Sequence, residues 1–156
     1  MFAVTLNQNY AVSAGRDKTS ETNLIQVYSL ATMKTVHKLE HSNWVTCLSF
    51  GPVDTCYADK LFSSSADHTV RIWDIENEKV EVEFKHDDIC NSFDIDKNGA
   101  TLVVGHYVGV SVWSIRDNKQ IAKIETDSSA INVRFNQSDD KIAVGCWGGE
   151  IYKITL

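Results

Sequence analysis

The chain has 156 residues, with 15 basic and 21 acidic side chains and a net charge of −6 when the histidines are neutral. This balance disfavours a protein whose whole surface binds nucleic acid, although it is compatible with a local basic patch. Hydrophobic residues make up 43% of the chain and proline occupies a single position, which indicates an ordered globular protein and excludes a disordered tail.

Short segments of alternating apolar and polar residues follow one another along the chain, and none has the spacing of an amphipathic helix. In KVEVEFK (79–85), for example, Val80, Val82 and Phe84 alternate with charged residues, as they do in a half-buried strand. The pattern predicts an all-β protein. In chain order, the predicted strands are 2–6, 10–17, 25–30, 45–50, 61–65, 69–75, 79–84, 89–95, 101–105, 110–115, 131–135, 141–145 and 151–156.

The predicted strands recur at a regular interval. Four bulky residues near the end of a predicted strand, Tyr28, Trp73, Trp113 and Ile154, are 45, 40 and 41 positions apart. A unit of three strands and a linking strand that repeats every 40 to 45 residues is typical of the blades of a β-propeller. We therefore predict one domain over residues 1–156, made of repeats at about 1–30, 31–75, 76–115 and 116–156.

The second repeat carries a more specific pattern. HSNWVTCLSF (41–50) followed by LFSSSADHTVRIWDI (61–75) resembles the consensus of the WD-repeat family, including the Trp73–Asp74 pair. In that family a histidine, a strand serine, a turn aspartate and the tryptophan form a hydrogen-bonded tetrad. The resemblance implies that His41, Ser63, Asp67 and Trp73 play these parts. A tetrad whose polar groups are all satisfied stabilises a blade and carries out no chemistry.

The other repeats keep fewer of these residues. The third repeat retains His86 and Trp113 but has Val104 and Val108 where the serine and the aspartate are expected. The fourth repeat retains only the pattern of strands. We expect such blades to be stable through apolar packing alone.

We expect no catalytic residue and no cofactor. Ser63 is predicted in the middle of a strand, without the exposed turn and the oxyanion donors that a catalytic serine needs. The four cysteines, Cys47, Cys56, Cys90 and Cys146, contain no C-x-x-C pair, so a zinc site would need assembly over long distances. We therefore predict no metal site. In a reducing compartment the four cysteines are expected to keep free thiols and to behave as small apolar side chains.

The sequence also predicts that the protein has no membrane partner. No run approaches the roughly 20 apolar residues of a membrane helix, and MFAVTLNQNY at the start lacks the features of a secretory signal. We expect a cytoplasmic location, with the nucleus as the alternative.

Within the WD-repeat family, the chain is most similar to the receptors for activated C kinase, which are scaffold proteins of the small ribosomal subunit. The segments that carry this likeness are AGRDKT (14–19), HSNWVTC (41–47) and VGVSVWSI (108–115). The likeness implies the C-terminal half of a seven-bladed ring. It also implies a non-catalytic scaffold that contacts 40S proteins and the 18S rRNA backbone and links translation to signalling proteins such as kinases. The alternative is a WD-repeat adaptor of a splicing, ubiquitin-ligase or G-protein-β-like complex.

Two sets of residues are candidate contacts with partners. Aligning the repeats places Tyr107 and Trp147 on one rim of the ring, with Trp44 nearby, and exposed aromatic residues often anchor interfaces. The alternative is that these aromatics pack against their own loops. Arg16 and Lys18 resemble the turn that contacts ribosomal RNA in the family, and the alternative for them is a solvated hairpin tip.

About four blades make an incomplete propeller, which we expect to expose two blade edges. Four interpretations follow. The chain is part of a longer protein, it is a half-propeller that rests on a large partner, or it closes its ring by self-association. The fourth is that it forms a small ring of four blades by itself.

Overall fold

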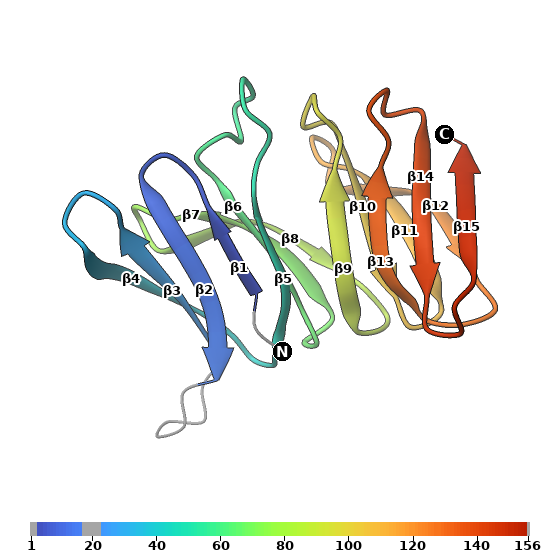
Figure 1. Ribbon diagram of the computed structural model, residues 1–156, viewed down its shortest axis with the longest axis horizontal. Helices are drawn as coiled ribbons and strands as arrows, with labels where there is room; N and C mark the ends of the chain where they lie inside the picture. Colours follow the sequence, from blue (N-terminus) through green and yellow to red (C-terminus); the bar gives the residue numbers. More distant parts are fainter. Residues whose placement is uncertain (1–2, 17–22, 156) are drawn as a thin grey trace.

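The computed structural model describes residues 3–16 and 23–155, which form β-strands and no helix (Figure 1). This part of the chain accordingly has no helix that is long and apolar enough to cross a membrane.

The strands form four antiparallel sheets, which we number in chain order. Sheet 1 contains β1 (Ala3–Leu6), β2 (Tyr10–Arg16), β3 (Asn23–Ser29) and β4 (Lys34–His41). Sheet 2 contains β5 (Val45–Phe50), β6 (Leu61–Ser65), β7 (Thr69–Asp74) and β8 (Lys79–Lys85). Sheet 3 contains β9 (Cys90–Ile95), β10 (Thr101–His106), β11 (Gly109–Ser114) and β12 (Lys119–Glu125). Sheet 4 contains β13 (Ala130–Phe135), β14 (Lys141–Cys146) and β15 (Ile151–Thr155).

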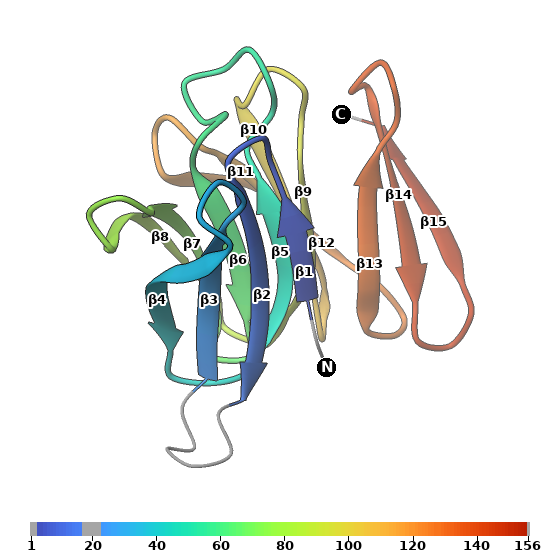
Figure 2. The ribbon, with the colours of Figure 1, turned by 60° about the vertical axis from the view of Figure 1, so that its left-hand side comes forward.

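The four sheets stand side by side in chain order, with sheet 1 and sheet 4 at opposite ends of the row (Figures 1 and 2). Their first strands, β1, β5, β9 and β13, contact one another in sequence along one side of the row. Within each sheet the chain then runs strand by strand away from this inner side. This is the arrangement of successive propeller blades, and the predicted all-β propeller fold with about four blades is confirmed.

The sequence repeats and the sheets are offset by one strand. The predicted repeat 31–75 begins with β4, the outer strand of sheet 1, and continues into β5, β6 and β7 of sheet 2. The repeat 76–115 likewise begins with β8 of sheet 2. Each of these repeats therefore links two neighbouring sheets covalently.

Apolar side chains fill the space between each pair of neighbouring sheets. Between sheets 2 and 3, Phe62, Phe84 and Phe93 are almost completely buried, together with Leu102 and Val104. Burying such a side chain stabilises the fold by roughly 1.5–3 kcal/mol. Comparable clusters join sheet 1 to sheet 2 around Ile25 and Trp73, and sheet 3 to sheet 4 around Val112 and Ile142. Because this packing fixes how the sheets are stacked, the turns at the ends of their strands lie on common rims.

Candidate functional site

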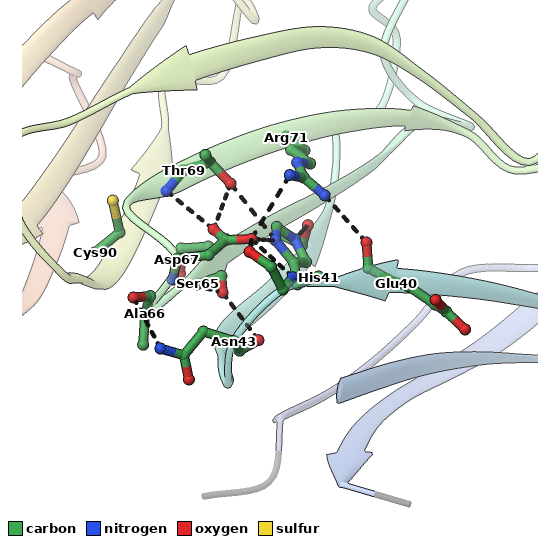
Figure 3. Close-up of polar contacts among 12 residues, drawn as sticks. Glu40, His41, Asn43, Ser65, Ala66, Asp67, Thr69, Arg71 and Cys90 are labelled. Carbon is green, nitrogen blue, oxygen red and sulfur yellow. Dashed lines mark hydrogen bonds and ion pairs between the residues drawn. The ribbon is translucent and has the colours of Figure 1, made fainter. Parts of the chain in front are cut away.

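The four residues of the predicted tetrad lie at the end of β4, on β6 and β7, and in the turn between these two strands. Figure 3 shows two of them, His41 and Asp67, close together. His41 Nδ1 lies 2.7 Å from Asp67 Oδ2, and His41 Nε2 lies 2.7 Å from Ser63 Oγ. The indole N–H of Trp73 donates to the same Ser63 Oγ at 2.7 Å. The tetrad therefore joins the last strand of sheet 1 to two strands and a turn of sheet 2.

Asp67 is held ionised by several donors although its side chain is only 3% exposed. Thr69 Oγ1 donates to its Oδ1 at 2.6 Å, and Arg71 Nη2 lies 3.6 Å from its Oδ2. Burial alone would raise the pKa of this carboxyl group, but the hydrogen bonds from His41 and Thr69 and the charge of Arg71 outweigh it and hold the pKa well below its usual range. The carboxylate is thus a fixed acceptor that orients the His41 ring.

Ser63 cannot act as a nucleophile in this arrangement. It is completely buried in the middle of β6, and its hydroxyl group already contacts both His41 and Trp73. No reacting carbonyl group can approach it, so the His–Ser–Asp set is structural and does not form a catalytic triad.

Sheet 3 contains a variant of the tetrad that the sequence interpretation missed. His86 Nδ1 lies 3.3 Å from Ser111 Oγ, and the indole N–H of Trp113 donates to this oxygen at 3.1 Å. Ser111 on β11 therefore takes the part for which the family pattern expects a residue of β10, at the position of Val104. The signal in the sequence was a serine two residues before the tryptophan, which faces the same side of the strand.

His86, which follows β8 of sheet 2, has no carboxylate partner in the part of the chain that the structure describes. Among the described residues, His86 Nε2 and His106 Nδ1 are buried without a hydrogen-bond partner, and the two rings lie 6.1 Å apart. Burial, reinforced by the neighbouring His106, lowers the pKa of His86 to about 4, and burial also lowers the pKa of His106. Both side chains are therefore neutral at pH 7.

Replacing Ser111 by alanine should lower the free energy of unfolding by about 1–2 kcal/mol, because it leaves a buried indole N–H without an acceptor. The measurement is urea unfolding followed by tryptophan fluorescence. Ser13→Ala, at an exposed strand position, is the control and should change stability by less than about 0.5 kcal/mol. Equal effects of the two substitutions would show that the Ser111 contacts add no stability.

The predicted aromatic residues lie on one rim, at the end of the sheets where the β6–β7 turn is also located. Trp44 precedes β5, Tyr107 lies in the β10–β11 turn and Trp147 lies in the β14–β15 turn. Their exposed fractions are 61%, 65% and 81%, so none of them is part of the core. Gly109 shapes the β10–β11 turn, since it has φ of 140° and any Cβ there would lie 2.2 Å from the Ile124 carbonyl oxygen.

Tyr107 and Trp147 border the same groove between sheets 3 and 4, whereas Trp44 lies outside it. The groove has a volume of about 1190 Å³. Besides these two aromatics it is lined by Thr46, Asn91, Val108, Glu125, Thr126, Asp127, Ser128, Ser129, Ile131 and Asn132. The structure therefore brings two of the three predicted rim residues into one concave site.

The predicted phosphate contact falls outside the part of the chain whose side chains are described. Arg16 is the last residue of β2 and its side chain is not among those described, and Lys18 lies outside the described residues.

The four cysteines are free and belong to different parts of the fold. Burial raises the pKa of the Cys90 thiol, which makes it a poor nucleophile and a poor metal ligand. Within residues 3–16 and 23–155, no group of three or more His, Cys, Asp or Glu side chains is placed to hold a metal ion.

Comparisons with known proteins support the assignment of the second repeat. Residues 33–74 match the family described as "WD domain, G-beta repeat". Periodic tryptophan protein 2 of Saccharomyces cerevisiae is 32% identical over 117 residues, which are 72% of this chain and 12% of that protein. Coronin-like protein crn1 of Schizosaccharomyces pombe is 33% identical over 95 residues, which are 60% of this chain and 15% of that protein. The chain thus spans less than a fifth of the length of either relative.

A solved structure agrees with the fold. The crystal structure of the computationally designed Ika4 protein superimposes with a TM-score of 0.82, and the match covers 99% of this chain and 89% of that one. At 20% identity this likeness concerns the fold alone. The comparisons do not support the narrower likeness to the receptors for activated C kinase. The structure and these matches together identify residues 33–74 as a WD40 repeat within a β-propeller array of four sheets.

Proposed function

We propose that the chain is a non-catalytic adaptor that binds a protein partner through the aromatic side chains of one rim, Trp44, Tyr107 and Trp147. WD-repeat proteins are typically scaffolds or adaptors without enzymatic activity. The observation that carries the proposal is the exposure of Trp147, 81%, beside Tyr107 at the edge of one groove. Tryptophan and tyrosine are the residue types that most often supply binding energy at interfaces.

Trp147→Ala should weaken binding of the partner about thirtyfold, the usual effect of removing one anchoring tryptophan. The measurement is affinity capture of proteins from the lysate of the source organism with the wild-type chain as bait, followed by titration of the captured partner. Val53→Ala, an exposed apolar residue in the loop after β5 on the opposite rim, is the control and should leave binding unchanged. A partner that binds both variants equally would contradict the proposal.

A narrower proposal is that this adaptor acts on the small ribosomal subunit and links translation to signalling proteins. It rests on the sequence AGRDKT (14–19) and on the other segments shared with the receptors for activated C kinase. Co-sedimentation with 40S particles that is lost on Arg16→Glu with Lys18→Glu would support it. A chain found only in the free fraction would contradict it and would favour an adaptor of another complex.

A further inference from the structure

The groove between sheets 3 and 4 has the size of a site for a stretch of polypeptide. Its volume of about 1190 Å³ exceeds the roughly 300–1,000 Å³ of pockets for small molecules. It is bounded by the β10–β11 turn, by the linker from β12 to β13 and by the β14–β15 turn. An extended segment of another protein fits such an open groove better than a metabolite does.

β-Bulges aim side chains into this groove. The pairing of β5, β9 and β13 with the next strand shifts register at Thr46, Asn91 and Ile131, so that each strand has one extra residue there. All three extra residues line the groove. A bulge turns a side chain away from the regular alternation of a strand, and bulges are frequent beside binding sites. The side chains of Thr46 and Asn91 each donate a hydrogen bond to a backbone carbonyl oxygen of the neighbouring inner strand. The Ile131 side chain, in contrast, is exposed.

The lining combines apolar surface with negative charge. Tyr107, Val108, Ile131 and Trp147 are all exposed large apolar residues. The charged residues of the lining are Glu125 and Asp127, and no lysine or arginine lines the groove.

The two carboxylates are free to attract a cation. Neither Glu125 nor Asp127 forms an ion pair with a basic side chain in the described residues, and Asp127 Oδ2 accepts one hydrogen bond from Tyr152 at 2.7 Å. Lys123, the basic residue nearest in sequence, lies 3.3 Å from Asp87. A cationic side chain that binds beside Tyr107 and Trp147 gains both Coulomb attraction and contact with an aromatic face, whereas the phosphates of nucleic acid are repelled.

From this geometry we infer that the groove selects an extended protein segment that carries lysine or arginine next to a large apolar side chain. The inference rests on the proposed adaptor function and names the chemistry of its partner. Glu125 and Asp127 supply the preference for the cation, and Ile131, Tyr107 and Trp147 contact its apolar neighbour.

The test pans a phage library of random short peptides against the full chain and against Glu125→Gln/Asp127→Asn. Peptides enriched on the wild-type chain should carry lysine or arginine beside leucine or an aromatic residue, and the double variant should bind them about tenfold more weakly. Raising the salt concentration from ~0.05 to ~0.5 M should weaken binding to the wild-type chain more than to the double variant. Asp54→Asn, on the opposite rim, is the matched control and should bind the peptides as the wild-type chain does.

Three results would overturn the inference: no enriched peptide, enriched peptides without an excess of basic residues, or binding of oligouridine RNA that requires Trp147. The two proposals fail in different ways. If Trp147→Ala abolishes binding of the captured partner and the double variant binds it normally, the adaptor function holds and the charge preference is wrong. If neither substitution affects that binding, both proposals are wrong.

Discussion

Replacing His41 by alanine should lower the free energy of unfolding by about 3 kcal/mol, because it removes a hydrogen-bond partner from a buried carboxylate, and an unsatisfied charged group costs more than an unsatisfied neutral one. The substitution leaves the Asp67 carboxylate buried with fewer donors, and it removes the contact that Ser63 makes 2.7 Å away. Arg71 and Thr69 continue to stabilise Asp67, which limits the loss.

The measurement is equilibrium unfolding in urea, followed by tryptophan fluorescence and by circular dichroism. His37→Ala is the matched control because His37 lies on the same strand, β4, and forms a partly exposed pair with Glu78 at 3.1 Å. That control should cost less than about 1 kcal/mol. If the two alanine variants were equally stable, the tetrad would contribute nothing beyond a surface contact.

Acidification from pH 6.5 to pH 4 should destabilise the fold by about 3 kcal/mol through His86 alone. The pKa of His86 is lowered in the folded state, to about 4 from an ordinary 6.5, so the unfolded chain takes up a proton first as the pH falls. The stabilisation is complete above pH 6.5 and is lost progressively toward pH 4. His106, whose pKa is also lowered, adds to the loss in the same direction.

The cause of this acid sensitivity is the burial of His86, which no carboxylate among the described residues offsets in the way that Asp67 stands beside His41. The charged groups near His86 are of both signs and lie at the surface of a small pocket, namely Lys85, Asp87, Asp88 and Lys123. None of them replaces the hydrogen bond that a carboxylate makes with a buried imidazole ring.

The test compares the free energy of unfolding at pH 7 and at pH 4.5 for the wild-type chain, His86→Gln and His37→Ala. In His86→Gln the free energy of unfolding should differ much less between pH 7 and pH 4.5 than in the wild-type chain. In His37→Ala the difference should be as large as in the wild-type chain. The same pH dependence in all three proteins would assign the acid sensitivity to other groups.

The sequence predicted the fold well because the alternation and the period of about 40 residues are local signals. It placed every described strand except β4 and β12. KTVHKLEH (34–41) and KQIAKIE (119–125) carry many charges because most of their residues are exposed, and only Leu39 and His41 of these two strands are buried. Tertiary pairing decides whether such segments are strands.

The candidate sites were predictable to different extents. The residues of the tetrad are implied by the resemblance to the WD-repeat family, and the rim position of Tyr107 and Trp147 follows from aligning the repeats. Ser111 was missed because the family pattern places the hydroxyl group on the preceding strand. The groove was missed because it depends on a shift of register at Ile131 and on a linker that brings Glu125 and Asp127 beside it. Neither feature has a signal in a single repeat.

The offset between repeats and sheets has a consequence for cleavage of the chain. A cut in the exposed turn at 30–33 falls at a repeat boundary, yet it separates β3 from β4, which remain joined by a ladder of hydrogen bonds from Asn23–His41 to Ser29–Lys34. A cut in the linker at 126–129 instead separates two sheets that are held mainly by side-chain packing. Complementary fragments made at the first site are therefore better suited to reassembly as a split protein than fragments made at the second.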